Sequence, residues 1–274
     1  MSGMARAFIG TSGWRYASWR GDFYPQGLRQ ADELAYLAQR MTSAELNGSF
    51  YSLQRPSSYE AWKAAVPEGF VFAVKGSRYI THMLQLRGIE TALANFLASG
   101  VLALGDTLGP VLWQLPARMA FDAGRLAEFF DLLPRTTADA AALAARHDAK
   151  VPDDRALVSA AADHPILHAV EPRHASFATG QARELFAREG ICMVTSDSAG
   201  TWPEVDADTS GIRYARLHGE ARLYGGGYSE ASLDRWAERV RSWLGAGRDA
   251  YVYFDNDADG RAPHDAAALL ARLA

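Results

Sequence analysis

Ionisable side chains stand at the ends of several short apolar segments of this sequence. Glu45 lies near the end of SAELN, Glu171 closes LHAVE, and His218 closes RYARLH. Carboxylates and imidazole can give up or accept a proton during a reaction. The side chains that we expect to act as acid, base or electrostatic catalyst are Glu45, Glu171, Asp197 and His218.

A second set of polar and aromatic residues occupies the same segment ends and the loops that follow them. Lysine and arginine can hold an anionic group, and arginine can do so with two parallel hydrogen bonds. Aromatic rings can cover the flat face of a sugar-like ligand, although these rings could instead fold back as a lid. We expect the substrate to contact Trp14, Asn47, Tyr51, Lys75, Gln114, Arg173, His174, Arg216, Tyr224, Tyr228, Asp255 and Asn256.

The segments that carry these residues alternate with alanine-rich helical stretches, which is typical of βα units and a parallel sheet. The expected strands are Ala7–Ser12, Ser43–Asn47, Phe70–Lys75, Pro110–Leu115, Leu167–Glu171, Ile191–Asp197, Arg213–His218 and Ala250–Asn256. Eight such strands predict an α/β fold, a (β/α)8 barrel of the TIM type, for which about 250 residues suffice. We therefore expect residues 1–274 to form a single domain.

Two intervals depart from a regular repeat. Residues 198–212 contain Gly200, Pro203 and Gly211 and predict an irregular link between the sixth and seventh strands. Residues 134–165 are longer than one crossover needs, and their alanine-rich centre predicts a helical insertion before the fifth strand.

Strand parity predicts which side chains share a face, because successive side chains of a strand point to opposite sides. In a barrel of this type the carboxyl ends of the strands form the active face. A consistent assignment lines that mouth with Glu45, Asn47, Lys75, Gln114, Glu171, Asp197, Arg216 and His218. Asp255 and Asn256 face opposite ways, and either could point inward.

Each of these residues also has a purely structural interpretation. Glu171 could be a buried ion-pair partner of Arg216 or Lys75, and Asp197 could cap the loop that follows it. Their convergence at one end of the predicted barrel favours a ligand site.

Composition excludes several classes of protein. Of 274 residues, 49% are hydrophobic and 22% are charged, which is enough apolar content for a large core. Cys192 is the one cysteine, so an internal disulfide is excluded and a reducing, cytoplasmic compartment is expected. No apolar run is long enough for a signal peptide or a membrane span. The net charge of −4 does not favour nucleic acid as a partner, although arginines near the aromatic loops leave it open.

The same residues give little indication of a cofactor. Carboxylates and imidazole could bind Zn²⁺, Mn²⁺ or Mg²⁺, but Lys75 and Arg216 at the same mouth would repel a cation. Gly10-Thr11-Ser12-Gly13 lacks the spacing of a dinucleotide-binding loop. We therefore name no metal ligands among the site residues and assign no cofactor, and a metal-assisted reaction stays open.

Several segments resemble domain-of-unknown-function family 72, the YecE-like family. They are GTSGW (10–14), GDFYP (21–25), ELNGSFY (45–51), FVFAVKGSRYITH (70–82), LGPVLWQLP (108–116), HAVEPRH (168–174), RLHG (216–219) and YVYFDN (251–256). The resemblance runs nearly from end to end and in order. It implies a TIM-barrel-like fold and no settled activity.

Three kinds of function fit these residues. The first is an enzyme of the hydrolase or lyase class that acts on a polar, possibly phosphorylated small molecule. The second is a nucleic-acid-binding or repair-related protein, for which aromatic loops with arginines suit single strands. The third is a barrel that binds a small molecule without catalysis.

Overall fold

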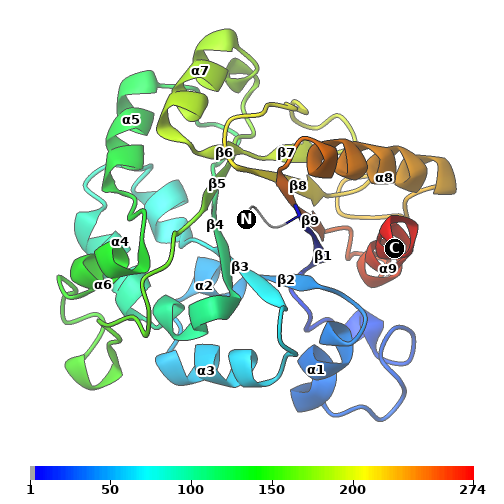
Figure 1. The fold of residues 1–274 in the computed structure, drawn as a ribbon, viewed down its shortest axis with the longest axis horizontal. Helices are drawn as coiled ribbons and strands as arrows, with labels where there is room; N and C mark the ends of the chain where they lie inside the picture. The colour runs from blue at the N-terminus through cyan, green and yellow to red at the C-terminus, as the bar shows by residue number, and fades with distance from the viewer. Residues whose placement is uncertain (1–3) are drawn as a thin grey trace.

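The computed structural model describes residues 4–274 and contains one parallel sheet that curves into a nearly closed barrel (Figure 1). The sheet order is β6-β5-β4-β3-β2-β1-β9-β8-β7, and every pairing between these strands is parallel. The strands are β1 (Ala7–Ser12), β2 (Ser43–Leu46), β3 (Val71–Lys75), β4 (Leu108–Gln114), β5 (His168–Glu171), β6 (Cys192–Met193), β7 (Thr195–Asp197), β8 (Ile212–Leu217) and β9 (Asp249–Phe254).

The structure has nine strands where the sequence predicts eight, because the predicted strand Ile191–Asp197 is divided. β6 pairs with β5 and β7 pairs with β8, with Val194 alone between the two strands. The backbone N–H of Val194 still donates to the carbonyl of Val170 on β5. The two ends of the sheet are therefore joined through one short segment of chain.

Helices surround the ring of strands on its outer side (Figure 1). They are α1 (Glu33–Ala38), α2 (Gly48–Tyr51), α3 (Pro56–Ala64), α4 (Glu90–Ala98), α5 (Ala123–Leu132), α6 (Thr137–Ala144), α7 (Gly180–Glu189), α8 (Glu230–Gly245) and α9 (Ala262–Leu273). α6 lies between α5 and β5, inside the interval where the sequence predicts an insertion. Residues 198–211, between β7 and β8, contain no helix.

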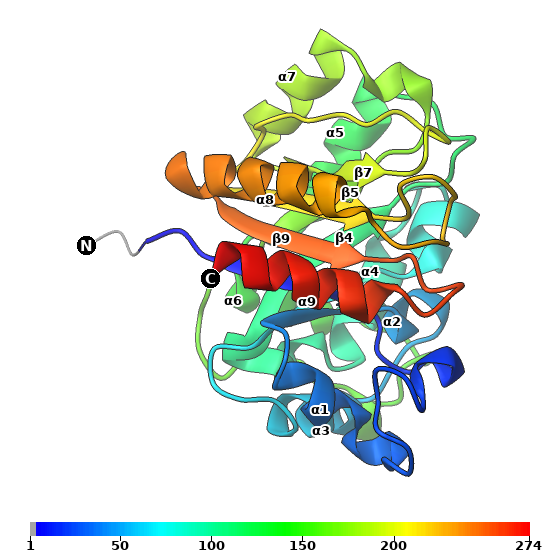
Figure 2. The same cartoon turned by 90° about the vertical axis from the view of Figure 1, so that its right-hand side faces the viewer.

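α8 shows how the sequence pattern fixes a covering helix. Leu233, Trp236, Val240 and Trp243 recur at helical spacing and are all buried, so one face of the helix is apolar. Ser229 caps the helix by accepting a hydrogen bond from the Ser232 N–H. α8 and α9 lie side by side over β9 (Figure 2).

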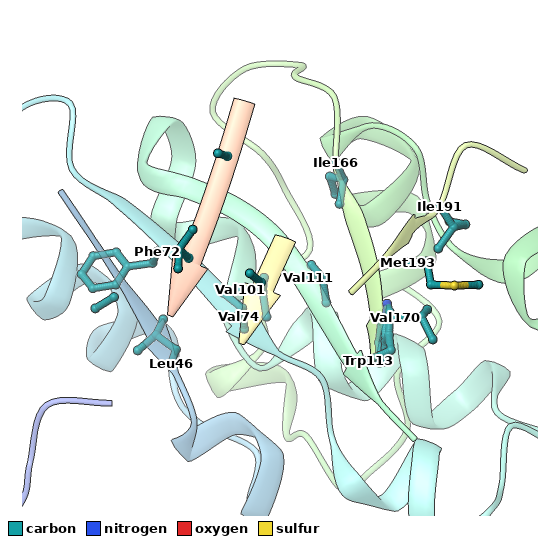
Figure 3. Close-up of a cluster of buried hydrophobic side chains, with 14 of the residues drawn as sticks. Leu46, Phe72, Val74, Val101, Val111, Trp113, Ile166, Val170, Ile191 and Met193 are labelled. Carbon is teal, nitrogen blue, oxygen red and sulfur yellow. The ribbon is translucent and has the colours of Figure 1, made fainter. Parts of the chain in front are cut away.

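The strands separate two apolar regions. Side chains on the outer face, with Leu46, Phe72, Val74, Val111 and Trp113 among them, pack toward the helices (Figure 3). A second cluster comes from alternate positions on the same strands and fills the barrel interior; its members are Phe8, Ala73, Leu112, Ala169, Cys192, Val194, Ile212, Tyr214, Tyr251 and Tyr253.

The interior cluster is rich in aromatic rings. Phe8 stacks on Tyr251 with ring centroids 4.7 Å apart, and the centroids of Tyr214 and Tyr253 are 5.1 Å apart. Farther along the same inward-facing positions, Tyr214 is followed by Arg216 and His218. The barrel therefore has an aromatic interior with an ionic layer nearer the carboxyl ends of the strands.

Candidate functional site

Arg216 is the centre of the ionic layer, and its side chain is completely buried. Its guanidinium donates to both carboxylate oxygens of Glu45 at 2.8 and 3.0 Å, and to Glu171 at 3.0 Å. It also donates to Asp255 at 3.1 Å and to the Ser12 hydroxyl at 2.8 Å. Three strands and the residue after β9 thus converge on one cation, which has no free donor directed at solvent.

His218, two residues after Arg216, lies between two carboxylates. Its Nε2 is 2.7 Å from Glu171, and its Nδ1 is 2.9 Å from Asp255. Glu171 is also bonded by the Ser196 hydroxyl at 3.0 Å. The predicted ion pair between Glu171 and Arg216 is confirmed at 3.0 Å.

The cations of this layer keep its carboxyl groups ionised. Burial alone would raise the pKa of Glu171, but Arg173, Arg216 and His218 hold it well below its usual range. Burial likewise opposes the ionised form of Asp255, and Arg216 and His218 again lower its pKa. These pairings compensate the desolvation cost of several buried charges.

Above this layer lies a cavity of about 700 Å³ at the carboxyl ends of the strands. Asp255 belongs both to the ionic layer and to the cavity wall, and its side chain is 17% exposed. The cavity is lined by Tyr16, Asn47, Phe50, Tyr51, Lys75, Arg78, His82, Met83, Gln114, Arg118, Arg173, Tyr224 and Asp255. Four of its thirteen lining residues are therefore lysine or arginine, against one carboxylate.

Lys75 ends β3 and points into this cavity from the barrel wall. Its Nζ lies 4.4 Å from the centre of the Phe50 ring, and within residues 4–274 it makes no ion pair. Burial, and then the positive charge of Arg216, lower the pKa of Lys75 to about 8. The next residue is Gly76, where a Cβ atom would lie 2.3 Å from the Trp113 ring. Only glycine therefore allows β3 to approach Trp113 this closely immediately after Lys75.

Arg173 connects the ionic layer to the cavity rim. Its guanidinium lies 4.1 Å from the centre of the Trp202 ring and is 3.3 Å from a carboxylate oxygen of Glu171. It also donates to the Tyr224 hydroxyl at 3.1 Å. Tyr224 has a φ of 61°, a backbone conformation that is uncommon for a residue other than glycine. The strain is compatible with a functional loop at this rim.

A short π-helix, Tyr79–Met83, supplies another part of the wall. Such turns are frequent at functional sites. His82 on this turn is 3.4 Å from the Gln114 side chain, and burial together with the charge of Lys75 lowers its pKa to about 4. The cavity therefore contains a neutral imidazole at neutral pH.

Six residues of this wall are not among the expected contact residues: Tyr16, Phe50, Arg78, His82, Met83 and Arg118. They lie in the connections after β1, β2, β3 and β4 rather than on the strands. Arg78 and His82 belong to the segment FVFAVKGSRYITH, so the motif itself was the available signal.

Trp14 lies in a neighbouring cavity of about 320 Å³ rather than in the wall of the larger one. Its ring meets that of Trp62 edge to face at 5.8 Å. Tyr16 and Asn47 line both cavities, so the two are adjacent.

The predicted placement of Asp197 at the barrel mouth is wrong. Ser196 is the neighbour that points inward, where it bonds Glu171. Asp197 therefore faces outward, into a separate hollow that it shares with Glu204, Glu220 and Trp236. The parity of the strand is regular; Cys192 and Val194 occupy the interior, which leaves the aspartate on the opposite face.

Besides Arg216, which lies in the buried ionic layer, three other expected contact residues also lie outside the large cavity. Tyr228 is buried, accepts from the Gly219 N–H and meets the ring of Phe254. Asn256 turns away from the barrel axis and donates to Asp265 on α9 at 2.7 Å, so Asp255 is the inward residue of the pair. His174 caps a short 3-10 turn by accepting from the Ser176 N–H.

The family model described as a protein of unknown function, DUF72, matches residues 8–274. The chain belongs to the DUF72 family. A DUF72 family protein from Thermotoga maritima is similar in structure, with 23% identity, coverage of 98% of this chain and 99% of that one, and a TM-score of 0.78. A DUF72 family protein from Enterococcus faecalis has 17% identity, coverage of 98% of each chain and a TM-score of 0.70. These likenesses show a shared fold. A search of curated proteins finds no match.

Two features of this DUF72 chain bear on cofactors and membranes. Within residues 4–274, no group of three or more His, Cys, Asp and Glu side chains is arranged to hold a metal ion. Over the same residues, none of the helices has the length and apolar character that a membrane crossing requires.

Proposed function

We propose that the cavity above Arg216 is the active site of an enzyme of the hydrolase or lyase class, acting on a small polar molecule with an anionic group such as phosphate. The observation that carries this proposal is the excess of cations in the cavity wall. Lys75, Arg78, Arg118 and Arg173 line it, against the single carboxylate of Asp255.

Arg216 takes no direct part in binding the anion under this proposal, although its type and position in the sequence suggested that role. Its guanidinium is fully buried and already bonds three carboxylates. The lysine and the arginines of the wall have donors that can reach a ligand. Arg118, for example, is exposed and donates to the backbone carbonyl of His82 at 3.3 Å. Arginine suits phosphate because its donors form a planar fork.

Asp255 is the carboxylate that we assign to acid–base chemistry. It faces the cavity and is ionised at neutral pH, as a proton acceptor must be, although the pairing with Arg216 and His218 that lowers its pKa makes it a weaker base than a free carboxylate. Glu171 and His218 are positioning residues in this scheme because they hold Asp255 through Nδ1 of His218. Glu45 positions Arg216. Gln114, Asn47, Tyr51 and Tyr224 remain as contacts for the polar body of the ligand.

The proposal includes two broader properties of the protein. A single domain agrees with the continuous sheet. A cytoplasmic location is supported by the buried, unpaired thiol of Cys192.

Calorimetric titration with inorganic phosphate and with glucose 6-phosphate tests the binding half of the proposal. Arg118→Met removes one wall cation, and we expect it to weaken binding by about tenfold, corresponding to about 1.4 kcal/mol. Arg188→Met on α7 is the matched control, since Arg188 is exposed and its one ion pair within residues 4–274 is with its neighbour Glu189.

Equal binding by wild type and Arg118→Met would overturn the anion site. A single-stranded oligonucleotide that bound with a steep salt dependence, when phosphate did not bind, would favour the nucleic-acid function instead. Phosphate binding without turnover of any phosphate ester or sugar phosphate in a substrate panel would favour a binding barrel.

A further inference from the structure

We propose that the Lys75 amine is a nucleophile that forms a Schiff base with the carbonyl carbon of an anionic aldehyde or ketone. This inference rests on the proposed function and assigns it to the lyase class. It also names the substrate class: a small carbonyl compound that carries a phosphate or carboxylate group.

The position of Lys75 supports this role. It extends from the end of β3 into the cavity, and its side chain is only 7% exposed. The buried carboxylates Glu45 and Glu171 are both occupied by Arg216, so neither holds the lysine in an ion pair. Its Nζ atom therefore lies 4.4 Å from the centre of the Phe50 ring and faces the interior of the cavity.

The electrostatics favour a reactive amine. A lysine becomes nucleophilic when burial or a nearby cation raises the fraction without its proton. Both conditions hold here, since burial and Arg216 lower the pKa of Lys75 to about 8. About a tenth of the side chains are then uncharged amines at pH 7, which is far more than for a lysine in water.

The other two lysines of the chain provide a contrast. Lys63 pairs with Asp106 at 2.5 Å, and its side chain is 40% exposed. Lys150 is exposed and lies 5.0 Å from the centre of the Tyr79 ring. Neither lines the large cavity, so their amines serve as internal references for Lys75.

The chemical step balances with groups that the cavity contains. The lone pair of the Lys75 amine forms a bond to the carbonyl carbon, and the carbonyl oxygen takes up a proton. The carbinolamine takes up a further proton, loses that oxygen as water and leaves a protonated imine. In a substrate whose β carbon bears a hydroxyl group, a base removes the hydroxyl proton and the bond between the α and β carbons breaks. The bond electrons form the enamine while the imine nitrogen accepts the C=N electron pair, and the β carbon leaves as the carbonyl fragment. Protonation of the enamine and hydrolysis of the imine by water free the second product and restore Lys75.

The rest of the wall is suited to this sequence of steps. Asp255 is ionised and can accept and return the proton that moves between amine, carbinolamine and departing fragment. Arg78, Arg118 and Arg173 can hold the anionic end of the substrate while its carbonyl group reaches Lys75.

Reductive trapping tests the inference. The protein is incubated with dihydroxyacetone phosphate, glyceraldehyde 3-phosphate or pyruvate, sodium borohydride is added, and the adduct is measured by intact mass and peptide mapping. Borohydride reduces the imine to a stable secondary amine. We expect one adduct per chain, on Lys75, for at least one probe, and at least tenfold less adduct from unphosphorylated dihydroxyacetone than from its phosphate.

Variants distinguish a specific adduct from general amine labelling. Lys75→Arg and Lys75→Met are expected to lose the adduct, with circular dichroism to show that the fold is kept. Lys63→Arg and Lys150→Arg are expected to retain it. Labelling spread evenly over the lysines, or no adduct on Lys75 with all three probes, would overturn the Schiff base. If inorganic phosphate still binds in an Arg118-dependent way, the proposed function survives that result; if phosphate does not bind, both fail.

Discussion

Arg216 and Glu45 form a two-pronged ion pair across the barrel interior, with Nη2–Oε1 at 2.8 Å and Nε–Oε2 at 3.0 Å. Both side chains are fully buried. β8 and β2 are not neighbours in the sheet, so this pair spans the barrel rather than following its wall. Glu45 also accepts from the Tyr214 hydroxyl at 2.7 Å, which ties the ionic layer to the aromatic interior.

Glu171→Gln is expected to destabilise the protein. The change keeps the size of the side chain but removes the charge that compensates Arg216 and Arg173, and it alters the hydrogen bond with His218. Loss of one partner from a buried ion pair typically costs about 3–5 kcal/mol. Urea unfolding at pH 7 measures the loss. Glu60→Gln, at an exposed position on α3, is the control, and an equal midpoint for both variants would show that the buried network contributes nothing.

The free energy of unfolding is expected to fall steeply in acid. Glu171 and Asp255 have folded pKa values below those of the unfolded chain, so the unfolded state binds more protons as the pH falls. Their contribution is complete above about pH 5 and is lost progressively below it. Unfolding between pH 3 and pH 7 measures this slope. Asp255→Asn is expected to have a shallower slope, and an unchanged slope would contradict the assignment.

Lys75→Met is expected to stabilise the protein at pH 7. The folded pKa of Lys75 is about 8, against 10.5 for the free side chain, so burying its charge costs about 3 kcal/mol below pH 8. Between pH 8 and about 10.4 the unfolded state binds more protons, and the stability of the wild type rises toward that of the variant. Parallel urea unfolding from pH 7 to pH 10.5 tests this convergence. A variant that is less stable than the wild type at pH 7 would show that burial of the Lys75 charge does not destabilise the folded state.

Asp257→Asn is expected to stabilise the protein above pH 8. Among the described residues no hydrogen bond of good geometry reaches the carboxylate of Asp257, and the nearby Tyr16 and Trp19 offset its burial only in part. Burial and the charge of Asp255 raise its pKa to about 8, so the folded state binds the extra proton between about pH 4 and pH 8. The free energy of unfolding of the wild type therefore falls as the pH rises through this interval, by a few kcal/mol, as the size of the pKa difference implies. Urea unfolding tests this expectation. At pH 4 the variant and the wild type should have the same free energy of unfolding, and at pH 9 the variant should have the higher one.

Much of the fold could be predicted from the sequence because the strands are short apolar segments of alternating side chains. β1 begins and ends at the residues predicted, Ala7 and Ser12. The division at Val194 could not be predicted, since Ile191–Asp197 is a uniform strand-forming segment and the break depends on its neighbours. That the chain is a single domain stays a prediction.

The site was predictable where strand parity decided it. Four of the expected residues do converge, namely Glu45, Glu171, Arg216 and His218. Their convergence could be predicted because the side chains that point inward recur at every second residue of a strand. Parity fixes only which residues share a face, and not which face is inside, so Asp197 was assigned to the wrong side. Loop residues such as Arg118 carry no such periodicity, and their place in the wall follows from tertiary structure alone.

The aromatic rings of Phe8, Tyr214, Tyr251 and Tyr253 affect how a ligand can enter and leave the cavity. They fill the barrel interior beneath the ionic layer, so a ligand does not reach the cavity through the amino ends of the strands. Tyr51 and Met83, in the cavity wall, are exposed. We therefore expect a molecule that reaches Lys75 to enter and leave on the side of the carboxyl ends of the strands. Under the proposed function, substrate and product would occupy the same cavity in turn, and a product that keeps the anionic group is expected to inhibit competitively.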